Sequence, residues 1–209
     1  MRGYGGSELS AAHAAWSLDV LADDVLAVAD AAGLDRVHLV GESIGGTIAL
    51  YCAIRNPERV RTLTVSNGGH VGASIQRVQA WKRTIDQQGI KAWSDQFMRD
   101  RFHDKALDAD RYRWYAAMQE GWKRDAILDA IGVLVGTDLS SRLGEVGCPA
   151  LLMHPDGSPF IPVDAVLDLY KRLPDARLQV IAHARHGMPF SHAGECARLL
   201  RAFLDDTCP

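Results

Sequence analysis

Ser43 and His186 are the two residues whose types and surroundings most directly indicate chemistry. Ser43 lies in the hexapeptide GESIGG at residues 41–46, between an apolar run at 37–40 and a second apolar stretch at 47–53. Glycines beside a serine let a strand turn sharply into a helix, and that turn exposes the hydroxyl. The pattern predicts a nucleophile for acyl transfer. A serine that merely caps a helix is the simpler alternative, but the strand and helix around it favour the nucleophile.

Two neighbours of Ser43 are candidate site residues. The backbone N–H of Ile44 and the positive end of the helix that starts there point to the place where an oxyanion would form. Ile44 is therefore the predicted oxyanion donor. Glu42 precedes the nucleophile and is a candidate substrate-binding residue that would tune selectivity, or else a plain substituent of the turn.

His186 is the predicted general base. It lies in the segment HARHGMPF at residues 183–190, after the last predicted strand, where the histidine partner of such a serine comes last in chain order. His183 and His192 are close enough in sequence to be confused with it. Three histidines within ten residues also raise a metal site, but no acidic ligand accompanies them at a familiar spacing, so neither a metal nor a cofactor is predicted.

The elements that would position these residues alternate along the chain. We expect strands over residues 36–40, 60–65, 149–153 and 177–181, and helices over 18–32, 44–55, 163–173 and 194–204. This alternation predicts an α/β fold with a mostly parallel sheet covered by helices on both faces.

One long segment interrupts the alternation. Residues 72–146 contain no convincing strand and hold four of the five tryptophans, and we interpret them as a helical cap inserted into a core formed by 1–71 and 147–209. Trp81 and Trp114 are the candidate substrate-binding residues of this cap. The tryptophans would otherwise serve to pack the cap helices together.

Composition restricts the partners. The 209 residues are 47% hydrophobic and 23% charged, which is ordinary for a soluble globular protein. The formal net charge of −3 gives no indication of a positively charged surface that would bind nucleic acid. A small-molecule substrate is favoured. No signal-peptide core and no apolar stretch of membrane-spanning length is present, so we expect a cytoplasmic protein that does not bind a membrane. The four cysteines form no C-x-x-C pair, and we expect them to be reduced and structural.

Together these residues resemble the α/β-hydrolase fold, in the branch of capped ester and lactone hydrolases that includes the 3-oxoadipate enol-lactonases. Besides the serine turn, NPERV at 56–60 resembles the link after the nucleophile helix, residues 138–149 resemble the approach to the strand bearing the acid, and ARHG at 184–187 resembles the histidine loop. The resemblance implies a serine hydrolase of small carboxylic esters or lactones that works through a Ser-His-acid triad and an acyl-enzyme.

The sequence departs from that family at the acid. The family pattern is His-Gly-x-x-Asp-Pro, whereas residues 154–159 read HPDGSP, so alignment on the proline puts Ser158 at the acid position. Asp156 is the only carboxylate nearby and is the predicted acid. Its alternative role is that of a turn former, because Pro-Asp-Gly is a strong turn signal.

A second departure concerns the start of the chain. RGYGGS at residues 2–7 resembles the family segment that follows the fourth of eight strands, so the earlier strands and the loop giving a second oxyanion donor have no counterpart here. A start assigned too late is the favoured explanation, ahead of a second chain supplying the missing half or self-pairing. The strand at 37–40 would then lie at a sheet edge, and a homodimer through that edge is expected.

Two further functions stay open at this point. A hydrolase that cleaves carbon–carbon bonds of ring-cleavage products would use a similar triad and cap. A catalytically impaired, ligand-binding remnant would keep the pocket without the chemistry, and Ser158 gives this alternative some support.

Overall fold

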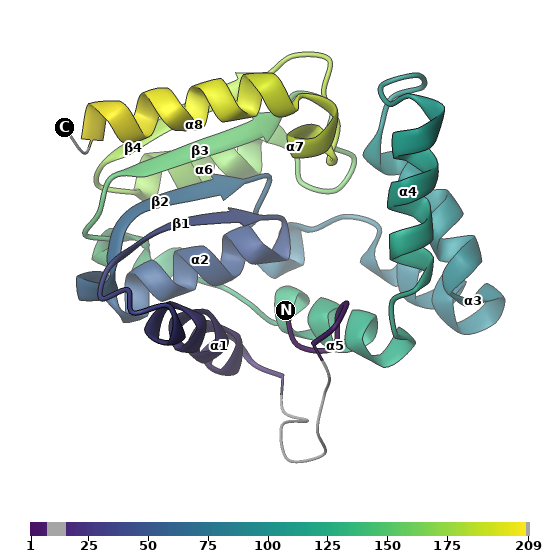
Figure 1. Ribbon diagram of the computed structural model, residues 1–209, viewed down its shortest axis with the longest axis horizontal. Helices are drawn as coiled ribbons and strands as arrows, with labels where there is room; N and C mark the ends of the chain where they lie inside the picture. The colour runs from purple at the N-terminus through teal and green to yellow at the C-terminus, as the bar shows by residue number, and fades with distance from the viewer. Residues whose placement is uncertain (8–15, 208–209) are drawn as a thin grey trace.

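The computed structural model describes residues 1–7 and 16–207. Its centre is a four-stranded parallel sheet in the order β1-β2-β3-β4 (Figure 1). The strands are β1 (Val37–Glu42), β2 (Val60–Ser66), β3 (Ala150–Pro155) and β4 (Ala176–Ile181). Because all four run the same way, their carboxyl ends share one edge of the sheet, which is where ligands gather in this class. The predicted α/β fold class is confirmed.

Helices connect and cover the strands. They are α1 (Leu18–Ala31), α2 (Ile44–Arg55), α3 (Val78–Arg101), α4 (Ala109–Glu120), α5 (Arg124–Val135), α6 (Val163–Arg172), α7 (Met188–Ser191) and α8 (Ala193–Thr207). Short 3₁₀ segments lie at η2 (Pro57–Arg59), η3 (Gly72–Ser74) and η4 (Ser140–Glu145). The expected strand over 36–40 in fact continues through Glu42, so Ser43 directly follows the strand.

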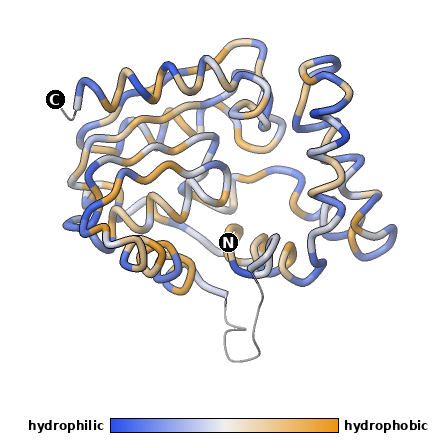
Figure 2. The backbone as a smooth tube through the Cα atoms, viewed as in Figure 1, coloured by the Kyte–Doolittle hydropathy of each residue, from blue (hydrophilic) through white to orange (hydrophobic). Residues whose placement is uncertain are grey.

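The two faces of the sheet are covered by different helices. On one face, α2 and α6 pack against Leu63 and Leu152, both fully buried. On the other, α8 and α7 pack against Leu151 and Met153. The adjacent residues Leu151 and Leu152 thus enter opposite cores, as the pleat of a strand requires. Figure 2 shows hydrophilic and hydrophobic segments alternating along α8, as expected for a helix with one apolar side.

β1 is an edge strand with one uncovered face. Helix α8 packs against β2 and β3, and it leaves Val40 of β1 55% exposed. Leu39, which points the other way, packs against the buried core beside α2. The edge therefore offers unpaired backbone groups and an apolar side chain to solvent.

Three helices, α3 to α5, separate β2 from β3 along the chain and lie toward the carboxyl ends of the strands (Figure 1). Helix α3 is broken at Gly89, which has φ 83° and ψ 177°. Aromatic contacts join these helices to the core, since the ring of Phe160, which follows β3, lies with its centroid 4.9 Å from those of Trp81 and Phe97. The one sheet-like contact in this segment is an isolated bridge between Val71 and Asp138.

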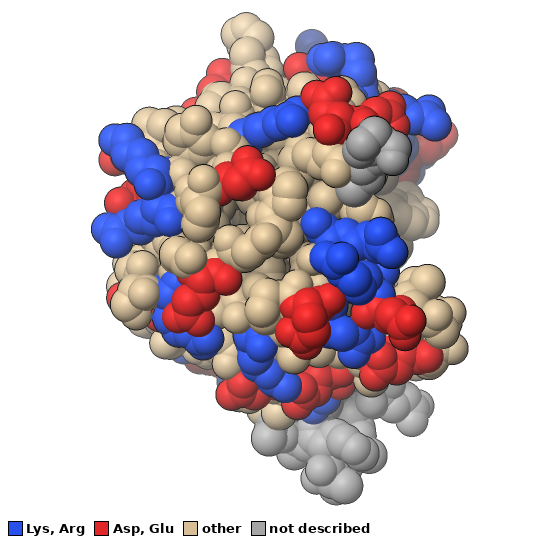
Figure 3. Space-filling view, turned by 90° about the vertical axis from the view of Figure 1, so that its left-hand side faces the viewer, with Lys and Arg blue, Asp and Glu red and all other residues tan. Residues whose placement is uncertain are grey.

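The surface charge, the apolarity of the helices and the state of the cysteines complete the description of the fold. Figure 3 shows the face at the left of Figure 1, with positive and negative side chains interspersed around an uncharged centre. Within the described ranges, none of the helices combines the length and apolarity that a bilayer span requires. Cys52, Cys148 and Cys196 are buried free thiols, and Cys208 lies outside the described residues.

Candidate active site

Ser43 occupies a strained turn between β1 and α2. Its backbone has φ 56° and ψ −122°, a positive φ that non-glycine residues adopt only when the surroundings enforce it. Its N–H donates to the carbonyl of Ser66 over 2.9 Å, which ties the turn to the end of β2. Gly41 is required because a Cβ there would lie 2.1 Å from the carbonyl oxygen of Gly45. The local sequence thus holds Ser43 in the wall of a cavity.

His186 contacts this hydroxyl. Its Nε2 lies 3.0 Å from Ser43 Oγ, and the imidazole is almost fully buried. The ring of Phe160 packs edge-on to it at a centroid distance of 4.8 Å, and the next residue, Gly187, donates its N–H to the carbonyl of Arg101 over 2.9 Å. The two residues expected to pair are therefore brought together, from segments 143 positions apart. Their catalytic roles remain predictions.

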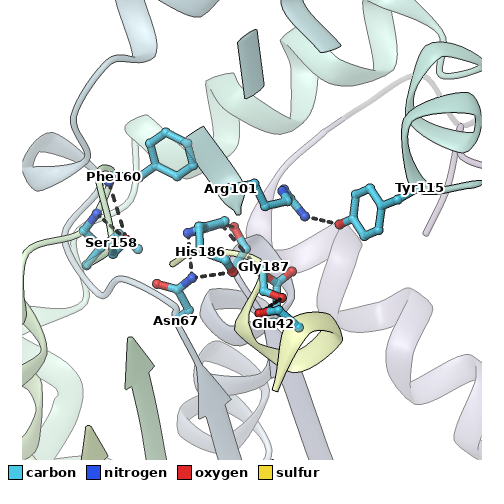
Figure 4. Close-up of polar contacts among 11 residues, drawn as sticks. Glu42, Asn67, Arg101, Tyr115, Ser158, Phe160, His186 and Gly187 are labelled. Atoms are coloured by element: carbon cyan, nitrogen blue, oxygen red, sulfur yellow. Dashed lines mark hydrogen bonds and ion pairs between the residues drawn. The ribbon is translucent and has the colours of Figure 1, made fainter. Parts of the chain in front are cut away.

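The other imidazole nitrogen faces Asn67, which sequence reasoning missed. Nδ1 of His186 lies 2.6 Å from Nδ2 of Asn67, and the same amide nitrogen lies 2.8 Å from the carbonyl oxygen of His186 (Figure 4). Asn67 directly follows β2, is 1% exposed and has φ 53°. The available signal was its place at a strand end beside the serine turn, since carboxyl ends of adjacent parallel strands meet.

Asp156 does not lie against His186, contrary to the prediction of a catalytic acid. Its carboxylate accepts the backbone N–H groups of His183 (2.9 Å) and Ala184 (3.1 Å). Burial raises the pKa of Asp156, but these two hydrogen bonds outweigh it, and the pKa lies below its ordinary value. The carboxylate stabilises the loop after β4 instead.

Ser158, at the position of the expected acid, is also engaged locally. Its Oγ accepts the N–H of Ile161 over 3.3 Å. Across the part of the chain that the structure describes, no carboxylate is hydrogen-bonded to Nδ1 of His186; the nitrogen faces the Asn67 amide.

Glu42 lies near the opposite side of the imidazole. Its Oε1 is 3.7 Å from Nε2 of His186 and has no hydrogen-bond partner, although the side chain as a whole is 35% exposed. Burial raises the pKa of Glu42, and the charge of Arg101 partly offsets this. Burial, together with the positive charge of Arg101, holds the pKa of His186 well below its ordinary value. The imidazole is therefore neutral at neutral pH.

The site opens into a cavity of about 670 Å³. Its walls are mainly aromatic and aliphatic, including Trp81, Trp93, Phe97, Trp122, Ile131 and Phe160. Ser43, Ile44, Glu42 and His186 all border it. Trp81 thus lies where a substrate-binding residue would.

Trp114 does not line the cavity, so its predicted substrate-binding role is corrected. It is 54% exposed and stacks on Phe190, with ring centroids 5.7 Å apart. The cavity-lining residues of α4 are Tyr115 and Met118, which are three apart and share one face of the helix. Trp114 points about 100° away from Tyr115 around the helix axis.

Arg101, also missed from the sequence, is the one cationic side chain buried in this wall among the described residues. It is 6% exposed, and its guanidinium lies over the rings of Phe97 (4.6 Å) and Tyr115 (5.2 Å). Its Nη1 donates to the Tyr115 hydroxyl, while Nε has no hydrogen-bond partner (Figure 4). A buried guanidinium with an unused donor is suited to an anionic ligand.

The other histidines of the loop are engaged elsewhere. Nδ1 of His192 lies 2.9 Å from the Ser191 hydroxyl, and the backbone of His183 binds Asp156. Over residues 1–7 and 16–207, no three His, Cys, Asp or Glu side chains are grouped as metal ligands would be.

Comparison with known proteins agrees with this geometry. The family model for the alpha/beta hydrolase fold matches residues 1–108. A 2-hydroxy-6-oxononadienedioate/2-hydroxy-6-oxononatrienedioate hydrolase of Dechloromonas aromatica is 32% identical over 84% of this chain, which spans only 64% of that relative's length. A 2-hydroxymuconate semialdehyde hydrolase of Pseudomonas putida is 30% identical, with 98% of this chain and 74% of the relative covered.

A solved structure shows the same fold. The enol-lactonase from Burkholderia xenovorans LB400 superimposes with a TM-score of 0.81 at 20% identity, covering 98% of this chain and 78% of that one. The parallel sheet and the serine turn agree with the family match, and the chain belongs to the α/β-hydrolase fold family.

Proposed function

We propose that this protein hydrolyses a small, largely apolar carboxylic ester or lactone, with Ser43 as nucleophile and His186 as general base. The observation that carries the proposal is the 3.0 Å contact between Ser43 Oγ and His186 Nε2 at the wall of an apolar cavity of about 670 Å³. A cavity of that size encloses a small molecule, and Glu42 and His186 border it together with the serine.

In this mechanism Ser43 Oγ attacks the substrate carbonyl while His186 takes the hydroxyl proton. The resulting oxyanion accepts a hydrogen bond from the N–H of Ile44 at the start of α2. Collapse of this intermediate expels the alcohol, which receives the proton from His186, and leaves an acyl-enzyme on Ser43. Water then attacks the acyl group with His186 again as base, and the acid is released.

The cavity wall supports a substrate with one anionic group. Its apolar body would pack among the tryptophans and Phe97, while a carboxylate would pair with the guanidinium of Arg101, which borders the cavity. Burial raises the pKa of Glu42, which lowers the fraction of this side chain that is ionised at a given pH and so weakens its repulsion of such an anion.

A second candidate is hydrolysis of a carbon–carbon bond in a ring-cleavage product. The specific support is the same arginine, together with relatives named for 2-hydroxy-6-oxo acids and a semialdehyde. The impaired, ligand-binding alternative is supported by the amide, in place of a carboxylate, at His186 Nδ1.

One panel of assays separates these functions. Purified protein is incubated with short-chain chromogenic esters, with lactones, and with coloured 2-hydroxy-6-oxo dienoates, and Ser43→Ala is compared with Ser74→Ala. Ser74 donates to the carbonyl of Val71 and does not itself line the cavity, so it is the matched control. We expect ester or lactone turnover in wild type and Ser74→Ala and none in Ser43→Ala. Turnover of dienoates alone would favour the second candidate, and ligand binding without turnover would favour the remnant.

A further inference from the structure

The orientation of the Asn67 amide can be read from its two contacts. Its side-chain nitrogen lies 2.8 Å from the backbone carbonyl oxygen of His186, which can only accept a hydrogen bond. The atom facing that oxygen must therefore be the NH₂ group, because an amide oxygen in the same place would repel it. The amide orientation follows from this contact.

The same NH₂ group lies 2.6 Å from Nδ1 of His186. An NH₂ group donates, so Nδ1 must accept and cannot itself carry a proton. The neutral imidazole then has its proton on Nε2, where it faces Ser43 Oγ at 3.0 Å. In this arrangement the histidine donates to the serine. A general base needs the opposite tautomer, with the Nε2 lone pair aimed at the hydroxyl.

We propose that Asn67 is the positioning residue of this active site, that it occupies the place of the catalytic acid, and that it holds His186 in the tautomer that cannot accept the Ser43 proton. The inference rests on the proposed function and adds a built-in attenuation to it. Substrate can reach the serine, but acylation requires that the imidazole first leave the Asn67 contact or move its proton from Nε2 to Nδ1.

The fold holds Asn67 firmly in this role. Glu42 and Ser66 are register partners at the ends of β1 and β2. Ser43 and Asn67 are therefore the first residues after these two neighbouring strands. The N–H of Asn67 donates to the carbonyl of Met153 over 2.8 Å, which fixes the residue against β3 as well. The side chain is enclosed, and its Oδ1 has no partner. Asp156 is bound to the loop after β4 and so does not compete with the amide for Nδ1 of His186.

A carboxylate at position 67 should reverse the tautomer. It could only accept from Nδ1, so the proton would move there and Nε2 would present its lone pair to Ser43. In a serine protease, replacing the aspartate by asparagine leaves the geometry intact but costs about 10⁴-fold in rate through the wrong tautomer. The carboxylate here must turn slightly away from the His186 carbonyl, so we expect Asn67→Asp to recover part of that, about 10- to 1000-fold.

The test uses wild type, Asn67→Asp, Asn67→Ala and Ser43→Ala as full chains. Nitrogen-15 NMR of the histidine side chains, assigned with His186→Gln, identifies the protonated nitrogen of His186, and a fluorophosphonate measures the reactivity of Ser43. We expect protonated Nε2 in wild type, protonated Nδ1 in Asn67→Asp, and labelling at least tenfold faster in that variant. Peptide mass spectrometry confirms that residue 67 is still an amide in wild type.

The outcomes separate cleanly. Protonated Nδ1 in wild type, or an unchanged tautomer or labelling rate in folded Asn67→Asp, overturns the inference. If Asn67→Asp does not fold, the wild-type spectrum decides, because the assignment requires an unprotonated Nδ1 there and a protonated Nδ1 refutes it. Asn67→Ala removes the donor without supplying an acceptor, so its fraction of Nδ1-protonated His186 should exceed that of wild type, and a smaller fraction would also refute the assignment. Equal labelling of wild type, Asn67→Asp and Ser43→Ala would reject the proposed function instead, whatever the NMR shows.

Discussion

Replacing Gly41 with alanine should disable the site, while the same change at Gly45 should be harmless. A Cβ on Gly41 would lie 2.1 Å from the carbonyl oxygen of Gly45 and 2.6 Å from the nitrogen of Gly46, both backbone atoms. Ordinary contact begins near 3.4 Å, so the start of α2 must move by roughly 1.3 Å. At Gly45 an added Cβ meets nothing within 4 Å.

The magnitudes follow from that displacement. Overpacking of this kind typically costs about 1–3 kcal/mol of folding free energy. Misplacing a reacting group by about 1 Å costs on the order of 10²-fold in rate. We therefore expect Gly41→Ala to unfold at lower urea concentration and to hydrolyse ester at least about 100-fold more slowly. Gly45→Ala should keep full activity and gain up to about 1 kcal/mol, since alanine is the better helix former.

Urea unfolding followed by tryptophan fluorescence and initial rates of ester hydrolysis are the two assays. Equal stability and equal rates for Gly41→Ala and Gly45→Ala would refute the reasoning that the turn depends on close backbone approach. A loss of activity in Gly45→Ala equal to that in Gly41→Ala would do the same.

Three further predictions concern other parts of the molecule. Arg101→Met should lower kcat/KM by about 10- to 100-fold for an ester carrying a free carboxylate, the range for a hydrogen bond to a charged group, and leave its neutral methyl ester unchanged; equal losses for both esters would contradict a role in anion binding. Buried His154 donates from Nε2 to the carbonyl of Ile161, and burial lowers its pKa to about 4. Because the unfolded chain binds this proton more readily, stability should fall as pH drops from about 6.5 toward 4, by about 3 kcal/mol from this residue. His154→Gln should flatten that slope in urea titrations against pH, and an unchanged slope would argue against it. Finally, we predict that the exposed edge at β1 pairs with a second copy, so light scattering should give a dimer or larger species for wild type and a monomer for Val40→Lys; a wild-type monomer would refute edge pairing.

The serine turn and the histidine were predictable because local sequence determines them. GESIGG supplies the glycines that the turn at Ser43 requires, and the loop after the last strand has a known place at the sheet edge. The alternating strands and helices were equally legible, because each carries its own hydrophobic pattern. These features need no knowledge of distant contacts.

The remaining site residues depend on tertiary contacts that no local pattern encodes. Asn67 reaches His186 only because β2 ends beside β1, and Asp156 is captured by backbone N–H groups of the loop after β4. Trp114 was assigned to the cavity by residue type, but the rotation of α4 turns Tyr115 inward instead. Arg101 stands in a charged stretch that reads as solvent-exposed, and only the packing of Phe97 and Tyr115 buries it.

The most direct test of the account is the location of a covalent adduct on Ser43. Trypsin should release residues 37–55 as one peptide, in which Ser43 is the only serine. After treatment of the native protein with a fluorophosphonate, we predict that this peptide carries the phosphonyl group on Ser43 and that urea-unfolded protein and His186→Gln remain unmodified. An unmodified peptide 37–55 in the native protein, or equal modification in His186→Gln, would contradict the central claim that Ser43 and His186 form a working nucleophile.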